Sequence, residues 1–171
     1  FTGGSNAGIS TTNSFGFNYR DQWSKRISVY GSYSYNHKNT NQLQNSYETN
    51  NTTLINNNQD LNSLTKGNSH RFTFNFEYQI DSFNYLKVSP SINYSGSDAN
   101  SQTIFDYKRP DGTKTLDGSN RNLNGSEAPN LAATILYNHK FRKRGRNSST
   151  SITLGTSQNN SEQDVTNLST Q

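Results

Sequence analysis

The stretch HRFTFNFEYQI, residues 70–80, decides the fold because apolar and polar residues alternate along it without a break. Side chains of a strand point alternately to its two faces, so one face here is apolar and the other is polar. The apolar face carries five residues, Phe72, Phe74, Phe76, Tyr78 and Ile80. This pattern is typical of a strand in the wall of a transmembrane β-barrel, with lipid on one side and water on the other.

Five further stretches repeat the alternation. Each is close to the 9 to 11 residues that a tilted strand needs, roughly, to cross a bilayer. They are residues 13–21, 26–37, 84–95, 131–141 and 148–157. The last of these is the weakest, with Ile152 and Leu154 as its clear apolar members.

The connections between these stretches alternate in length. Residues 22–25, 81–83 and 142–147 are predicted short turns, whereas residues 38–69 and 96–130 are long and rich in Asn, Ser and Gly. Outer-membrane barrels have short periplasmic turns and long external loops. The sequence therefore predicts an all-β fold, an antiparallel transmembrane β-barrel segment of about six strands (three hairpins) with long external loops.

One part of the long loops is expected to be ordered. Residues 103–116 read TIFDYKRPDGTKTL, and Pro110, Asp111 and Gly112 fit a tight turn between two β-prone arms. Asp106, Asp111 and Asp117 do not have the spacing of a calcium loop, so turn chemistry is the preferred interpretation of these carboxylates.

Composition fits this class once the barrel is considered. A hydrophobic content of 27% is typical of disorder, but 12% aromatic residues within the alternating stretches provide ordering power. A barrel wall faces lipid with only every second residue, so low mean hydropathy is expected. The chain has no cysteine, which excludes a disulfide-stapled miniprotein and a cysteine-ligated zinc module.

The net charge of +4 raises the question of nucleic acid binding. The densest basic cluster consists of Lys140, Arg142, Lys143, Arg144 and Arg146. It lies at a predicted turn without an aromatic stacking platform, so we interpret it as a solvated turn and expect no nucleic acid partner.

The sequence shows no catalytic constellation and no cofactor or metal site, so we expect a protein that is not an enzyme. His37, His70 and His139 fall on the lipid-facing register near the ends of the predicted strands, and two of them without a third ligand are a weak metal site. Glu77 is expected to form a structural pair with Lys87 across two strands. Trp23, beside Tyr19 and Lys25, is expected to anchor the membrane interface.

Several strings at strand ends and turns resemble a known family. They are FGFNYRDQW (15–23), GSY (31–33), HRF (70–72), EY (77–78), IDS (80–82), Pro90, YNHKF (137–141) and RGR (144–146). They are similar to the barrel of a Bacteroidota outer-membrane family related to TonB-dependent receptors. The resemblance implies an outer-membrane location, a barrel of roughly 22 strands with a plug, and a role in solute uptake or in an outer-membrane complex. It also implies contacts with lipid, with the rest of the barrel and with a surface lipoprotein or larger complex.

Six strands are too few to close a barrel, since eight is about the smallest number known. We therefore expect residues 1–171 to be a fragment of one outer-membrane β-barrel domain without a visible plug, and we expect residues 1–10 and 158–171 to be loops. The alternative is a soluble or surface-attached β-sandwich binding module, an adhesin or a carbohydrate-binding domain. In that case Trp23 could belong to the core, and Tyr47, Phe105 and Tyr107 would contact the ligand.

Overall fold

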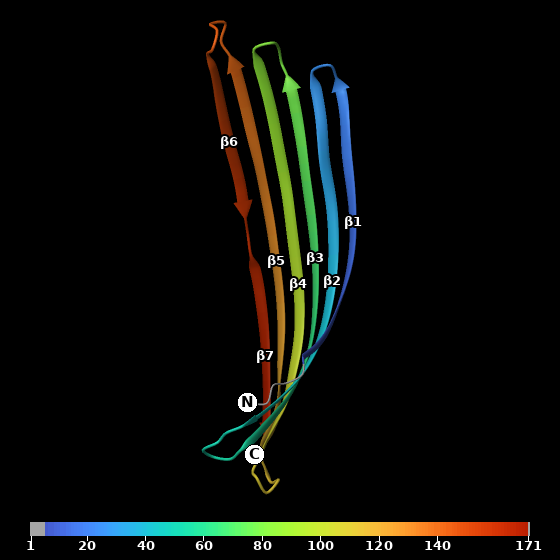
Figure 1. The fold of residues 1–171 in the computed structure, drawn as a ribbon, viewed down its shortest axis with the longest axis vertical. Coiled ribbons are helices and arrows are strands. Elements are labelled where there is room, and N and C mark those ends of the chain that lie inside the picture. The colour runs from blue at the N-terminus through green and yellow to red at the C-terminus, as the bar shows by residue number, and fades with distance from the viewer. Residues whose placement is uncertain (1–5, 171) are drawn as a thin grey trace.

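The computed structural model describes residues 6–170, which form one antiparallel sheet (Figure 1). Its seven strands are β1 (Asn6–Ser24), β2 (Ile27–Thr49), β3 (Asn56–Gln79), β4 (Asn84–Lys108), β5 (Lys114–Lys140), β6 (Asn147–Ser157) and β7 (Asn160–Thr170). The all-β antiparallel class predicted from the sequence is confirmed. Across the described range no helix is both long and apolar enough to span a membrane.

The strands follow one another in the sheet in chain order from β1 to β6. β6 and β7 both pair with β5, β6 along residues 130–140 and β7 along residues 117–127. The break between them lies opposite Ala128 and Pro129. Because proline has no N–H to give to a ladder, Pro129 explains why the edge strand is divided there.

Three predicted strands, residues 13–21, 84–95 and 148–157, lie entirely within observed strands. The other three each exceed the observed strand by one residue, at the start of residues 26–37 and at the end of residues 70–80 and 131–141. The three predicted hairpins are confirmed by the pairing of β1 with β2, β3 with β4, and β5 with β6. The predicted turn at Pro110, Asp111 and Gly112 is also confirmed. There the N–H of Gly112 donates to the carbonyl of Arg109 at 2.9 Å, and Gly112 has a φ of 85°.

The prediction of two long loops is wrong. Most of residues 38–69 and 96–130 continue strands β2 to β5, which are 23 to 27 residues long, and only residues 50–55 and 109–113 turn the chain. The backbone pairs in register throughout, from Ile27↔Tyr78 to Thr49↔Asn56 in β2 and β3. Polar residues predominate on both faces of these halves, so no apolar alternation marks them in the sequence. We call them the polar halves of β2 to β5.

Residues 6–10 and 160–170 are likewise strand and not loop, whereas residues 158 and 159 link β6 to β7. β1 begins at Asn6 and β7 covers Asn160–Thr170, so the sheet has seven strands where six were expected. The rest of that prediction, residues 1–5 and 171, lies outside the described residues.

The sheet has two ends that differ in their turns (Figure 1). The three-turn end carries the turns that follow β1, β3 and β5, and the two-turn end carries those that follow β2 and β4. The expected grouping of the short turns at one end is therefore confirmed.

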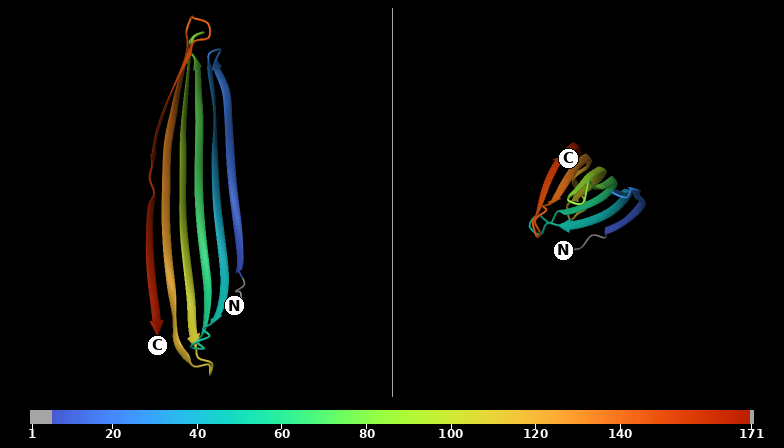
Figure 2. Two further views of the ribbon diagram at one scale, coloured as in Figure 1. Left: turned by 60° about the vertical axis from the view of Figure 1, so that its left-hand side comes forward. Right: turned by 90° about the horizontal axis from the view of Figure 1, so that it is seen from above.

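The sheet is twisted and is not closed (Figure 2). Among the described strands β1 contacts only β2, while β6 and β7 contact only β5. Val29 is the single buried apolar side chain within residues 8–170. The sheet therefore has two open edges and no interior core.

Candidate functional site

One face of the sheet carries an apolar band near the three-turn end. The row Val29↔Phe76↔Val88↔Ile135↔Ile152 joins five strands, because directly opposed residues of neighbouring strands share a face. A second row joins six strands and comprises Phe17, Tyr33, Phe72, Ile92, Leu131 and Thr156. We define the apolar band as these two rows and the residues of the same face between and beside them.

The apolar band is open to its surroundings. Phe17 is 57% exposed, Ile92 is 45% exposed and Leu154 is 63% exposed. Monomeric soluble proteins rarely present contiguous apolar patches of more than a few hundred Å². This face is therefore built to contact an apolar medium or another apolar surface.

Aromatic residues with polar partners border the band at the three-turn end. The indole Nε1 of Trp23 donates to the hydroxyl of Tyr19 at 3.3 Å, and that hydroxyl donates to Asp21 at 3.1 Å. Tyr137 donates to the side-chain oxygen of Asn84 at 2.6 Å. Trp23 is 59% exposed, so it is not the core tryptophan of a sandwich.

A second aromatic border lies at the other edge of the band, around His70. Its Nδ1 is 2.8 Å from the Tyr33 hydroxyl, and its ring centroid is 4.8 Å from that of Tyr35 and 6.0 Å from that of Tyr94. The band thus lies between two aromatic borders, and in each border hydroxyl, indole or imidazole groups form hydrogen bonds.

The opposite face of the same region is polar and hydrogen-bonded across strands. The predicted pair of Glu77 and Lys87 is confirmed, with Oε1 and Nζ 3.2 Å apart. Tyr30 joins both residues, because its hydroxyl donates to Glu77 at 3.0 Å and accepts from Lys87 at 2.7 Å. Ser89 donates to Asn75 at 2.9 Å on the same face, within the interruption of the β3–β4 pairing beside Pro90. These contacts satisfy polar groups and provide no nucleophile with an adjacent base.

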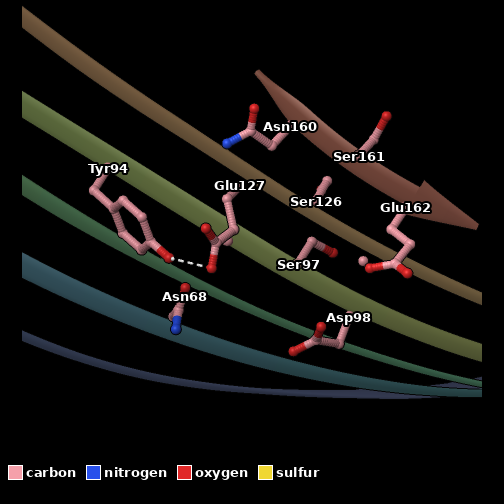
Figure 3. Close-up of a pocket in the computed structure, with 11 residues that line it drawn as sticks. Asn68, Tyr94, Ser97, Asp98, Ser126, Glu127, Asn160, Ser161 and Glu162 are labelled. Carbon is pink, nitrogen blue, oxygen red and sulfur yellow. Dashed lines mark hydrogen bonds between the residues drawn. The ribbon is translucent and has the colours of Figure 1, made fainter. Parts of the chain in front are cut away.

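A polar hollow of about 620 Å³ lies beyond the second aromatic border, on the face of the band (Figure 3). Tyr94 donates to Glu127 across it at 3.2 Å, and Asp98 and Glu162 add two more carboxylates. Gly96 and Gly125 open the hollow, because neither has a side chain to fill it. No group of three or more His, Cys, Asp or Glu side chains within residues 6–170 has metal-binding geometry.

Two of the three histidines lie farther from a strand end than the sequence predicted. His139 lies next to the end of β5, as expected, and its Nδ1 is 2.7 Å from Asn84 Oδ1. His37 and His70 lie within β2 and β3, since these strands extend beyond the predicted ends. They are offset in register, because His37 is opposite Asn68 and His70 is opposite Tyr35.

The three aspartates of residues 103–117 have separate roles. Asp111 accepts from the N–H of Thr113 at 2.9 Å, which lowers its pKa, and this confirms the turn interpretation. Asp106 and Asp117 lie in strands, so the turn interpretation is wrong for them. A hydrogen bond from Lys108 lowers the pKa of Asp106, and Lys114 lies 3.7 Å from Asp117.

The aromatic residues of the sandwich alternative do not form one surface. Tyr47 is opposite Asn58, which is opposite Asp106, so Tyr47 shares a face with Asp106. Phe105 and Tyr107, neighbours of Asp106 in β4, point to the other face. The described residues also form a single sheet, without a second sheet packed on it.

No protein-family model and no curated protein sequence matches the chain. Solved structures resemble it distantly. The RagAB peptide importer in the "open-open" state is 10% identical, with a TM-score of 0.41, over 89% of this chain and 20% of that chain. BauA, the ferric preacinetobactin receptor from Acinetobacter baumannii, is 11% identical, with a TM-score of 0.39, over 96% of this chain and 28% of that chain.

The chain spans 20% of the length of the RagAB component and 28% of the length of BauA. The RagAB peptide transporter gives the same coverage with a TM-score of 0.40. Likenesses at this distance carry no argument about function.

Proposed function

We propose that this chain is a wall segment of an outer-membrane β-barrel of the TonB-dependent receptor type, with its apolar band in contact with lipid. The role is structural and not enzymatic. The parent protein acts in solute uptake or as a component of an outer-membrane complex. The observation that carries the proposal is the apolar band on one face, backed by a hydrogen-bonded polar face.

The height of the band matches a membrane. In β3 it runs from the His70 border to the end of the strand at Gln79, about nine residue steps, which is about 31 Å along the strand. At a tilt of about 40° this gives about 23 Å, close to the band of roughly 25 Å in outer-membrane barrels. Aromatic residues at both borders are the expected anchors, because their rings lie among headgroups while their polar atoms stay hydrated.

The polar face fits the lumen side of a barrel wall. Tyr30, Glu77 and Lys87 form a charged and hydrogen-bonded cluster there. A charged group facing hydrocarbon is costly, whereas water or the residues of a plug can solvate it.

The two outer edges of the described sheet have no pairing strand, which favours a larger barrel. β1 has no partner on its outer side among the described strands, nor do β6 and β7. Unpaired N–H and C=O groups of an edge within hydrocarbon cost several kcal/mol each, roughly, so a wall segment needs further strands on both sides. The proposed partners are therefore membrane lipid and the rest of the same barrel.

The polar halves of β2 to β5 extend beyond the band at the two-turn end. In outer-membrane barrels the end that carries the long loops faces the cell surface. In this chain the paired polar halves take the place of those loops, so we assign the two-turn end to the cell surface. A surface lipoprotein or another subunit of a complex would contact these halves. The receptor type and the Bacteroidota origin rest on the resemblance of the strings at the strand ends.

Membrane fractionation tests the proposal. The full-length protein is expressed, outer membranes are isolated by density, and the pellet is washed with alkaline carbonate or urea. Retention in the membrane until detergent is added is the expected result. Release of the folded protein by the wash would contradict the proposal and favour a surface-attached module.

A further inference from the structure

The turn between β5 and β6 forms a basic hollow of about 510 Å³ at the three-turn end. Its lining combines four cationic side chains with two phenylalanine rings, and comprises Phe83, Asn84, His139, Lys140, Phe141, Arg142, Lys143 and Arg146. The turn that presents them is well defined. The N–H of Phe141 donates to the carbonyl of Arg146 at 3.0 Å, and Gly145 has a φ of 81°.

The cations of this turn are available to a ligand. Lys140, Arg142, Lys143 and Arg146 form no ion pair and no side-chain hydrogen bond with any residue in the range 6–170. The carboxylate of the neighbouring turn, Asp81, is already engaged. It accepts from the N–H groups of Phe83 at 2.7 Å and Asn84 at 2.8 Å, and from the side-chain amide of Asn84.

The hollow adjoins the apolar band on the same face. His139 is opposite Asn84, and two residues further along the strands Tyr137 is opposite Leu86, a residue of the band. Phe83 is 42% exposed and Phe141 is 49% exposed. Unpaired positive charge therefore lies directly beside exposed apolar surface.

We propose that this hollow binds the headgroup phosphate of an anionic phospholipid, whose acyl chains pack against the phenylalanine rings and the adjoining band. The inference rests on the proposed function, because it places this end of the sheet at a lipid leaflet. Charge complementarity favours an anion, since basic residues at a membrane surface attract anionic lipids. The exposed rings favour a lipid over a soluble phosphate, which has no apolar part to cover them.

Native mass spectrometry of the full-length protein tests the inference. The protein in a neutral detergent is offered phosphatidylglycerol and phosphatidylcholine in equal amounts, with and without inorganic phosphate. We expect at least about tenfold more bound phosphatidylglycerol than phosphatidylcholine, and no displacement by inorganic phosphate. The triple variant Arg142→Gln, Lys143→Gln, Arg146→Gln should lose this preference. The control Lys66→Gln, Arg109→Gln, Arg121→Gln removes the same charge elsewhere and should keep it.

Each other outcome overturns the inference. If the wild-type protein binds phosphatidylglycerol and phosphatidylcholine equally, the hollow is only a solvated turn. This outcome is read from the wild-type protein alone. Equal loss in both triple variants shows that net charge alone attracts the lipid, and displacement by inorganic phosphate shows that the ligand is a soluble anion. Insertion of the wild-type protein into pure phosphatidylcholine vesicles is measured beside these. If insertion occurs without lipid preference, the inference alone fails, and if insertion fails, the proposed function fails with it.

Discussion

Phe74 and Asn75 are neighbours in β3 that point to opposite faces of the sheet. If the face of Phe74 contacts hydrocarbon, an arginine there must be placed near the middle of the bilayer. We predict that Phe74→Arg lowers the free energy of unfolding of the full-length protein in lipid vesicles by about 2–4 kcal/mol. Asn75→Arg is the matched control and should be tolerated. Equal losses, measured by urea denaturation, would contradict the assignment of the faces.

Asp81 gives a pH-dependent prediction for the turn between β3 and β4. Hydrogen bonds from Asn84 and Phe83 lower its pKa below the usual 3.8. A lowered pKa means that the folded state prefers the carboxylate, so this stabilisation is present above pH 3.8 and is lost as the pH falls through the folded pKa.

The comparison of wild type with Asp81→Asn measures this effect. The difference in unfolding free energy should favour the wild type near neutral pH and shrink as the pH falls below 3.8. A difference that stays constant over this range would show that the carboxylate charge has no part in the turn.

Glu77 and Lys87 lie directly opposite each other in β3 and β4, so their interaction depends on the register of these two strands. A slip of one residue would put each on the opposite face from its partner. We predict a coupling free energy of about 0.2–1 kcal/mol in a double-mutant cycle with Glu77→Gln and Lys87→Gln. A coupling of zero, with Tyr30 unchanged, would show that the register is held by the apolar band alone.

The sequence predicted the half of each strand that carries apolar residues and missed the polar half. Residues 70–80 alternate clearly, whereas in residues 56–69 nearly all side chains are Asn, Ser, Thr, Gln or charged. Cross-strand hydrogen bonds such as Asn45 to Asp60 at 2.6 Å and Thr49 to Asn56 at 2.8 Å stabilise these halves. A hydropathy pattern cannot reveal such pairs, because a strand without a buried face has no alternation of apolar and polar residues.

The same limit applies to the candidate site. The basic turn was visible in the sequence as a cluster of charges, but its position beside Phe83 follows from the pairing of β4 with β5. The contact of His70 with Tyr33, Tyr35 and Tyr94 likewise depends on the register of three strands. The pair of Glu77 and Lys87 was predictable because a single short hairpin brings the two residues together.

The polar halves yield a prediction about hydrogen exchange. In β3, Asn62 lies opposite Leu43 of β2 and Gln102 of β4, so ladders flank it on both sides. We predict slow amide exchange for residues 57–66 in the full-length protein and fast exchange for residues 51–53 in the turn. Fast exchange over the whole range 50–66 would contradict the paired strands and would favour the long external loop that the sequence predicted.

At the scale of the whole molecule, the proposed function requires lipid on the apolar face of the sheet and water on the polar face. The described residues comprise one buried apolar side chain, an exposed apolar band and two open edges, which are the features that the proposed barrel wall requires. The proposed orientation puts the three-turn end in the periplasm and the two-turn end at the cell surface. The assignment of this chain to a barrel wall follows once lipid is shown to cover the band.

Spin-label scanning of residues 71–79 in β3 tests this central claim most directly. The chain has no cysteine, so a label at each position in turn requires no background substitutions within it. With the full-length protein in lipid vesicles, collisions with oxygen report contact with lipid, and collisions with a water-soluble nickel complex report contact with water. We predict that oxygen accessibility peaks at Phe72, Phe74 and Phe76, and that nickel accessibility is higher at Thr73, Asn75 and Glu77. Alternation of the opposite phase, or no alternation, would contradict the account.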